Sequence, residues 1–138
     1  MGIRMPSAMA GAIVPVVLPY YPQVTADVTD AAVKCKSPVK GVVVGVHVGA
    51  RAIGGGTPFT DVDVEVLKGS TALLSANAPI VDGSALPAGG VYGTLSTVSG
   101  ALRVAADDVL AIKLIDVTGG ASTPTLDGLV VTIYIAAS

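Results

Sequence analysis

The chain has 138 residues, 51% of them hydrophobic, 4% aromatic and 13% charged, and its formal net charge is −2. This length fits a single domain with its own core, while a charged fraction of about half the usual value leaves apolar surface open for association. The eight basic residues are scattered, which excludes a nucleic-acid-binding patch, and no apolar run reaches the roughly 18 residues of a membrane span.

Residues 1–22 are apolar but are interrupted by prolines, which exclude a helix or a central strand. The prolines and the single basic residue also argue against a secretory signal, so we expect an extended arm. Two interpretations of the arm stay open: an edge strand on the chain's own sheet, or an arm that docks on a partner or a sister subunit. The candidate contact residues are Ile13, Val14, Val16, Val17, Leu18, Tyr20 and Tyr21.

Residues 23–138 form the predicted domain, in which apolar residues alternate with polar or small ones at a period of two. Successive side chains of a strand point to opposite faces, so this pattern predicts sheets with one buried face. A polar connector over residues 23–30 and a short strand over 31–36 precede the longest central strand, over 40–50. On that strand we expect Val42, Val44, Val46 and Val48 on one face and Val43, Gly45 and His47 on the other.

Similar alternations follow, separated by turns rich in Gly, Pro and Asp. Val62, Val64 and Val66 alternate with Asp61, Asp63 and Glu65, and the later apolar sets are Leu110, Ile112 and Leu114, then Leu129, Val131, Ile133 and Ile135. Further strands are expected at residues 60–68, 71–75, 92–98, 101–104, 109–117 and 129–136. About eight strands at a spacing of roughly 8–12 residues, with no helical period, predict an all-β antiparallel sandwich.

No group of residues points to catalysis, a metal or a cofactor. Same-face carboxylates on the strand with Asp61 lie about 6.8 Å apart, which suits a solvated face better than a metal site. We interpret His47, the sole histidine, as a structural or interface residue and Cys35, the sole cysteine, as an inert thiol, because catalysis or zinc binding needs more partners. The glycine-rich residues 54–58 lack the Lys-Ser/Thr of a phosphate loop. We therefore expect no enzyme.

Three short segments carry a family resemblance. They are residues 20–33 (YYPQVTADVTDAAV), 93–97 (GTLST) and 105–112 (AADDVLAI). Together they resemble small virion proteins of tailed bacteriophages, namely the jelly-roll capsid decoration (cement) and head-fibre proteins. In that family a Leu-Ser-Thr strand precedes an Ala-Gly-Asp turn and a hydrophobic strand. Asp107 stands here where the family has glycine. The resemblance spans residues 20–137.

The resemblance implies a jelly-roll fold with an extended N-terminal arm and no catalytic residues. It also implies a homo-oligomer (dimer or trimer) assembled in the host cytoplasm, which binds the major capsid protein on the outer surface of the virion and stabilises the shell. Nucleic acid and membrane are not expected partners. The alternative is a glycan- or surface-binding jelly-roll module of a fibre or adhesin, for which the aromatic residues are few. A pilin-like or secreted surface protein is a third possibility.

Overall fold

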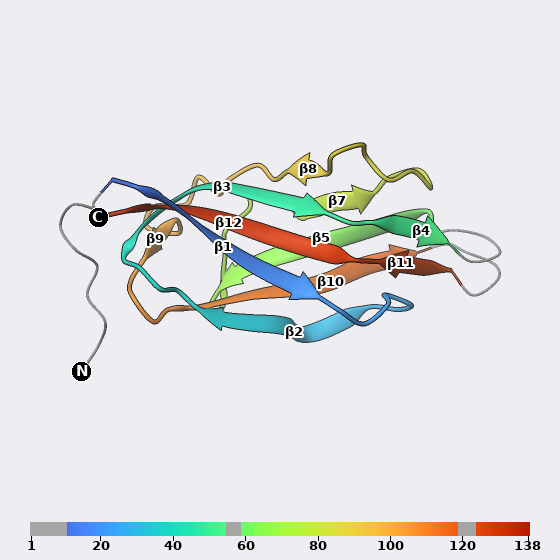
Figure 1. Cartoon of the computed structure of the whole chain (residues 1–138), viewed down its shortest axis with the longest axis horizontal. Coiled ribbons are helices and arrows are strands. Elements are labelled where there is room, and N and C mark those ends of the chain that lie inside the picture. Colours follow the sequence, from blue (N-terminus) through green and yellow to red (C-terminus); the bar gives the residue numbers. More distant parts are fainter. Residues whose placement is uncertain (1–10, 55–58, 119–123) are drawn as a thin grey trace.

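The computed structural model describes residues 11–54, 59–118 and 124–138 (Figure 1). The first ten residues of the predicted arm, most of the glycine-rich loop and the middle of the loop before the last strand lie outside these ranges. In the described residues the chain is all β, with antiparallel pairing throughout, as the sequence predicts. The described part holds no helix that is long and apolar enough to cross a membrane.

One sheet has the strand order β1-β12-β3-β8, and β9 also pairs with β3 (Figure 1). Its central strands β12 and β3 are the last strand and the predicted longest strand, and both are rich in β-branched residues, which favour strands. The members of this first sheet are β1 (Ile13–Tyr20), β3 (Gly41–Gly49), β8 (Val91–Tyr92), β9 (Arg103–Val104) and β12 (Leu129–Ala137).

The other sheet has the order β2-β10-β5-β6, and β7 also pairs with β5. A small pair, β4 with β11, extends one end of the molecule. The members of this second sheet are β2 (Val28–Lys36), β5 (Asp61–Lys68), β6 (Thr71–Ala72), β7 (Ala78–Val81) and β10 (Val109–Thr118), and the small pair consists of β4 (Ala52–Gly54) and β11 (Thr125–Asp127).

Both sheets contribute to one hydrophobic core, which gives the molecule a sandwich-like character. The expected alternation is confirmed on three strands. On β5, β10 and β12 the inward side chains are fully buried, and they are Val62, Val64, Val66, Leu110, Ile112, Leu114, Leu129, Val131, Ile133 and Ile135. Burying each of these side chains contributes about 1.5–3 kcal/mol from the hydrophobic effect, so these strands supply much of the driving force for folding.

The alternation expected along residues 40–50 is wrong in its first half. On β12, Tyr134 lies opposite Gly45 and Ile135 lies opposite Val43, so Val44 is an extra residue without a partner in the register. Such a β-bulge shifts the facing of the strand by one residue. As a result Val43 is buried with the later valines, while Val42 and Val44 are 43% and 49% exposed on the outer face.

The described part of the predicted arm is an edge strand of the first sheet. β1 pairs with β12 over its whole length, from Ile13 opposite Ala136 to Tyr20 opposite Leu129. The backbone N–H of Ala137 donates to the oxygen of Ala12 at 2.9 Å. The backbone N–H and C=O groups of even-numbered residues of β1 therefore point toward β12, and those of odd-numbered residues point toward the open edge of the sheet. The two prolines of β1 are at odd positions, where a missing N–H costs no ladder hydrogen bond.

The turn before β10 contains an aspartate in a backbone conformation that favours glycine. This residue, Asp107, has a positive φ of 70°. The N–H of Asp107 donates to the oxygen of Ser37 at 2.9 Å, and the Oδ2 of Asp108 accepts from the N–H of Ala105 at 2.8 Å. These bonds hold Asp107 in the left-handed region, which Asp tolerates better than most residues do.

Candidate functional site

The outer side of the first sheet has one charged strand residue, Arg103 of β9, which is exposed and lies opposite Val42. The other strands, β1, β12, β3 and β8, contain no Asp, Glu, Lys or Arg at all. Because their inward side chains fill the core, the outward ones form a continuous surface, which we call the uncharged face. Its members are Ile13, Pro15, Val17, Pro19, Val42, Val44, His47, Tyr92, Val130, Thr132, Tyr134 and Ala136.

The strand register arranges these side chains in rows across the sheet. One row runs from Val17 through Thr132 and His47 to Tyr92. The side chains of Val17 and Tyr92, at the two ends of this row, are 54% and 72% exposed. Single exposed apolar residues are normal on a protein surface, but a contiguous apolar patch indicates an interaction site. The uncharged face is therefore the candidate functional site.

The structure divides the predicted contact residues into three groups. Ile13 and Val17 lie on the uncharged face, and Tyr21, directly after β1, is 89% exposed. Val14 and Tyr20 are half-buried against the core. Val16 and Leu18 are buried within it, so neither offers a surface to a partner, and the predicted contact set is corrected at these two positions. The reason is strand alternation, which sends every second side chain of β1 inward.

The sequence-based prediction also missed members of this face. Val42 and Val44 were expected on the same side as the buried Val46, and the bulge turns both outward. A signal for this was present in Gly45, because a glycine inside a strand pattern indicates a bulge. Tyr92 belongs to a strand of only two residues, too short for its outward direction to follow from any periodicity.

The sole histidine supports the exposed tyrosine at the edge of the uncharged face. The Nε2 of His47 is 2.7 Å from the oxygen of Gly89, which fits an Nε2–H donor. Its ring meets that of Tyr92 edge-on, with centroids 4.9 Å apart and an angle of 63°. His47 therefore has a structural role, holding the segment before β8 and the ring of Tyr92 in place.

Cys35 lies in the other sheet, where its Sγ donates to the oxygen of Lys36 at 3.4 Å.

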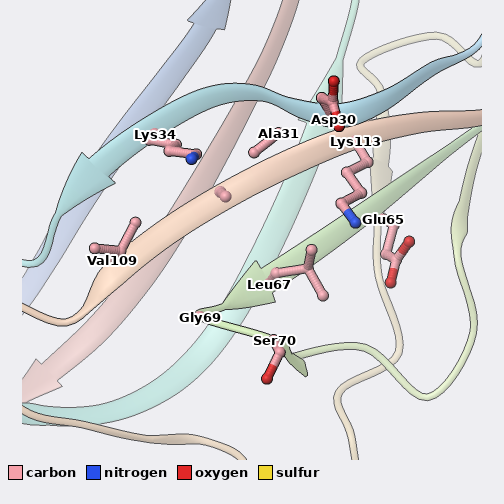
Figure 2. A pocket seen from close by; sticks show the side chains of 10 residues that line it. Asp30, Ala31, Lys34, Glu65, Leu67, Gly69, Ser70, Val109 and Lys113 are labelled. Carbon is pink, nitrogen blue, oxygen red and sulfur yellow. The ribbon is translucent and has the colours of Figure 1, made fainter.

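The outer side of the second sheet is charged and hollowed. A hollow of about 420 Å³ lies over β2, β10 and β5 (Figure 2). Its floor contains the small side chains of Ala31 and Ala111, and Figure 2 shows the lysine of β10 reaching toward Glu65. The charged residues that line it are Asp30, Lys34, Glu65 and Lys113. Among the described residues no group of three or more His, Cys, Asp or Glu is placed to hold a metal ion.

No protein-family model matches this chain, and neither a curated protein nor a solved structure matches it at a significant level.

Proposed function

We propose that this chain is a structural virion protein that decorates and cements the outer capsid shell of a tailed phage. The uncharged face binds the major capsid protein, and the protein performs no catalysis. The observation that carries the proposal is the gathering of exposed apolar side chains on one sheet side, over the four strands β1, β3, β8 and β12, which contain no charged residue. A freely dissolved monomer would gain nothing from such a surface, whereas a building block buries it on its partner.

A jelly-roll topology, which is the fold of the resembling family, is part of this proposal. Eight strands, β1, β2, β3, β5, β7, β8, β10 and β12, pair as the first with the eighth, the second with the seventh, the third with the sixth and the fourth with the fifth. This is the pairing of one long antiparallel hairpin that has been rolled up into two facing sheets. The remaining short segments β4, β6, β9 and β11 extend this frame.

The backbone of β1 favours contact through the face and not through the edge. A partner strand that joined the open edge would need N–H donors at the odd positions of β1, and Pro15 and Pro19 remove two of them. Prolines on an edge strand are a common defence against such strand addition. The side chains of the uncharged face, and not the backbone of β1, are therefore the contacting groups.

The size of the face fits binding in many copies. Strands of eight residues span about 26 Å and four strands about 19 Å, so the face measures at most roughly 500 Å² in projection. A stable interface buries about 800 Å² on each partner, so one contact of this size is weak. Repetition over a capsid lattice compensates for weak single contacts through avidity.

The proposal is tested by co-sedimentation with empty capsids. Val17→Asp places a charge on the uncharged face, at the β1 end of its central row, and we expect it to weaken binding by at least about tenfold, because a buried carboxylate would lose its hydration. Val98→Asp is the matched control, since Val98 is also exposed but lies in the loop between β8 and β9, beside a different hollow. Undiminished binding by the Val17 variant would contradict the proposal.

One observation favours the alternative of a glycan-binding module. Tyr92 presents an exposed ring, held by His47, and the hydroxyl-bearing Thr132 lies on the other side of His47 in the same row. A sugar ring stacks on such an aromatic surface while hydroxyl groups bind its edge. A glycan-array signal that disappears in Tyr92→Ala, together with no binding to capsids, would favour this function.

A further inference from the structure

With the exception of Lys113, the charges on the outer side of the second sheet are sorted by sign along the strands. At the start of β10, Val109 lies opposite Lys36 and Ala111 lies opposite Lys34. Further along β10, Lys113 lies opposite Glu65 and Ile115 opposite Asp63. Asp61, the first residue of β5, lies beyond Asp63 in the same direction. This surface, which we call the dipolar face, has a basic end at Lys34 and Lys36 and an acidic end at Asp61, Asp63 and Glu65.

The hollow lies where the two ends meet (Figure 2). Ala111 is short and lies between Lys34 on β2 and Leu67 on β5, so the middle of this row is low. In the next row Lys113 rises from the sheet with Glu65 beside it, and Asp30 lines the same hollow from β2. Within the described residues, Lys34, Lys113, Asp30 and Glu65 form no ion pair with one another or with other groups.

We propose that the dipolar face is a two-fold contact between two copies of this chain. A two-fold contact requires a self-complementary surface. If the axis runs across the strands and through the hollow, each strand lies over the same strand of the second copy in the opposite direction, so the Lys34 end of β2 lies over its Asp30 end. Lys34 then faces Asp30 of the second copy, and Lys113 enters the hollow over Ala111 of the second copy. The reverse orientation, with the axis along the strands, would bring Asp30 against Glu65, two like charges.

This contact gives the proposed cementing function, on which this step rests, a second binding site. A copy has one uncharged face, on the side of the molecule opposite to the dipolar face. Joining two copies through their dipolar faces leaves two uncharged faces directed away from each other. Such a dimer holds two capsid subunits at a junction, whereas a monomer holds only one. Cementing requires this bivalence.

The test measures the dimer dissociation constant of the full chain by sedimentation equilibrium. Dimerisation is expected at low salt and should weaken as salt screens the charges. Lys34→Glu should raise the dissociation constant by at least about tenfold, because each dimer loses two attractions and gains two repulsions. Adding Asp30→Lys to that variant restores the opposite signs across the axis and should restore dimerisation. Lys40→Glu, an exposed change of the same kind off this face, is the matched control.

Three results would overturn the proposal: a monomer at all concentrations in low salt, a dimer that Lys34→Glu leaves unchanged, or no recovery in the double variant. Circular dichroism of each variant confirms that it remains folded. The capsid assay separates this contact from the docking function. A monomeric Lys34→Glu variant that binds capsids but no longer raises their heat resistance supports both proposals. A dimer that weakens with salt but does not bind capsids supports the contact through the dipolar face and refutes the proposed binding of the uncharged face to the major capsid protein.

Discussion

The two outer faces of this molecule have the same strand geometry and opposite chemistry. On the first sheet the row across the middle reads Val17, Thr132, His47 and Tyr92, with no formal charge. On the second sheet the comparable row has Lys34 opposite Ala111, and in the next row Lys113 lies opposite Glu65. Both sheets send the same kind of side chain inward, namely Val, Leu and Ile.

This difference shows that the inward and outward positions of a strand carry separate information. The inward positions determine that two sheets form around one core, and either sheet could exchange its core residues for others of similar volume. The outward positions have little influence on the fold and determine what each face can meet. The uncharged face suits a partner that excludes water from it, whereas the dipolar face suits a partner with the opposite order of charges.

The largest expected effect is on the free energy of unfolding, when a substitution at an inward position of β12 is compared with one at an outward position of the same strand. Ile133→Ala removes a fully buried side chain from the centre of β12, and we expect the free energy of unfolding to fall by about 2–5 kcal/mol, because a cavity remains. Thr132→Ala, at the neighbouring outward position, should change it by no more than about 0.5 kcal/mol. Urea denaturation of both variants measures the difference. Equal losses would show that the outward face also contributes to stability.

A second prediction concerns how the uncharged face holds its exposed tyrosine. Gly90 has a φ of 78°, and a Cβ there would lie 2.4 Å from the oxygen of Val48 and 2.8 Å from the ring of His47. Gly90→Ala should therefore cost about 1–3 kcal/mol through strain and overpacking, and it should displace Tyr92. Thermal unfolding and tyrosine fluorescence measure both effects.

Gly89→Ala is the control for this prediction. Gly89 has a similar φ of 75°, but a Cβ there would meet nothing within 4 Å. Its variant should show only the cost of placing alanine in the left-handed region, about 1–2 kcal/mol, and the fluorescence of Tyr92 should stay unchanged. If the two variants lose the same stability, the close approach of Val48 and His47 to position 90 has no energetic role.

The positions of the long strands β3, β5, β10 and β12 were predictable from the sequence because they depend on local alternation, whereas β7 lies in a stretch expected to be a loop and only Val91–Tyr92 forms a strand near the one expected at residues 92–98. The buried sets on β5, β10 and β12 follow a strict period of two, and the prolines of β1 restricted it to an edge. The bulge at Val44 was not predicted, since it depends on the register with Tyr134, 90 residues further along the chain. A local pattern contains no information about such a partner.

The two candidate surfaces were harder to predict for the same reason. Val17 and Tyr92 share a row only because β12 and β3 lie between them, and Lys34 and Glu65 line one hollow only because β10 separates their strands. β10 also has register shifts toward both of its neighbours, so even a correct strand order would have misplaced part of the dipolar face. Binding to a capsid protein remains a prediction.

The smallest expected effect is at the turn that leads into the second sheet. Asp107 has a φ of 70°, so Asp107→Gly should remove backbone strain and raise the free energy of unfolding by up to about 1 kcal/mol. The gain is limited because glycine also has more freedom in the unfolded chain. Asp108→Gly, one residue later, should instead lower stability by about 0.5–2 kcal/mol, because it removes the carboxylate that accepts from the N–H of Ala105. Opposite signs for these neighbouring variants, measured by urea denaturation, would show that the turn favours glycine at its first aspartate and a carboxylate at its second.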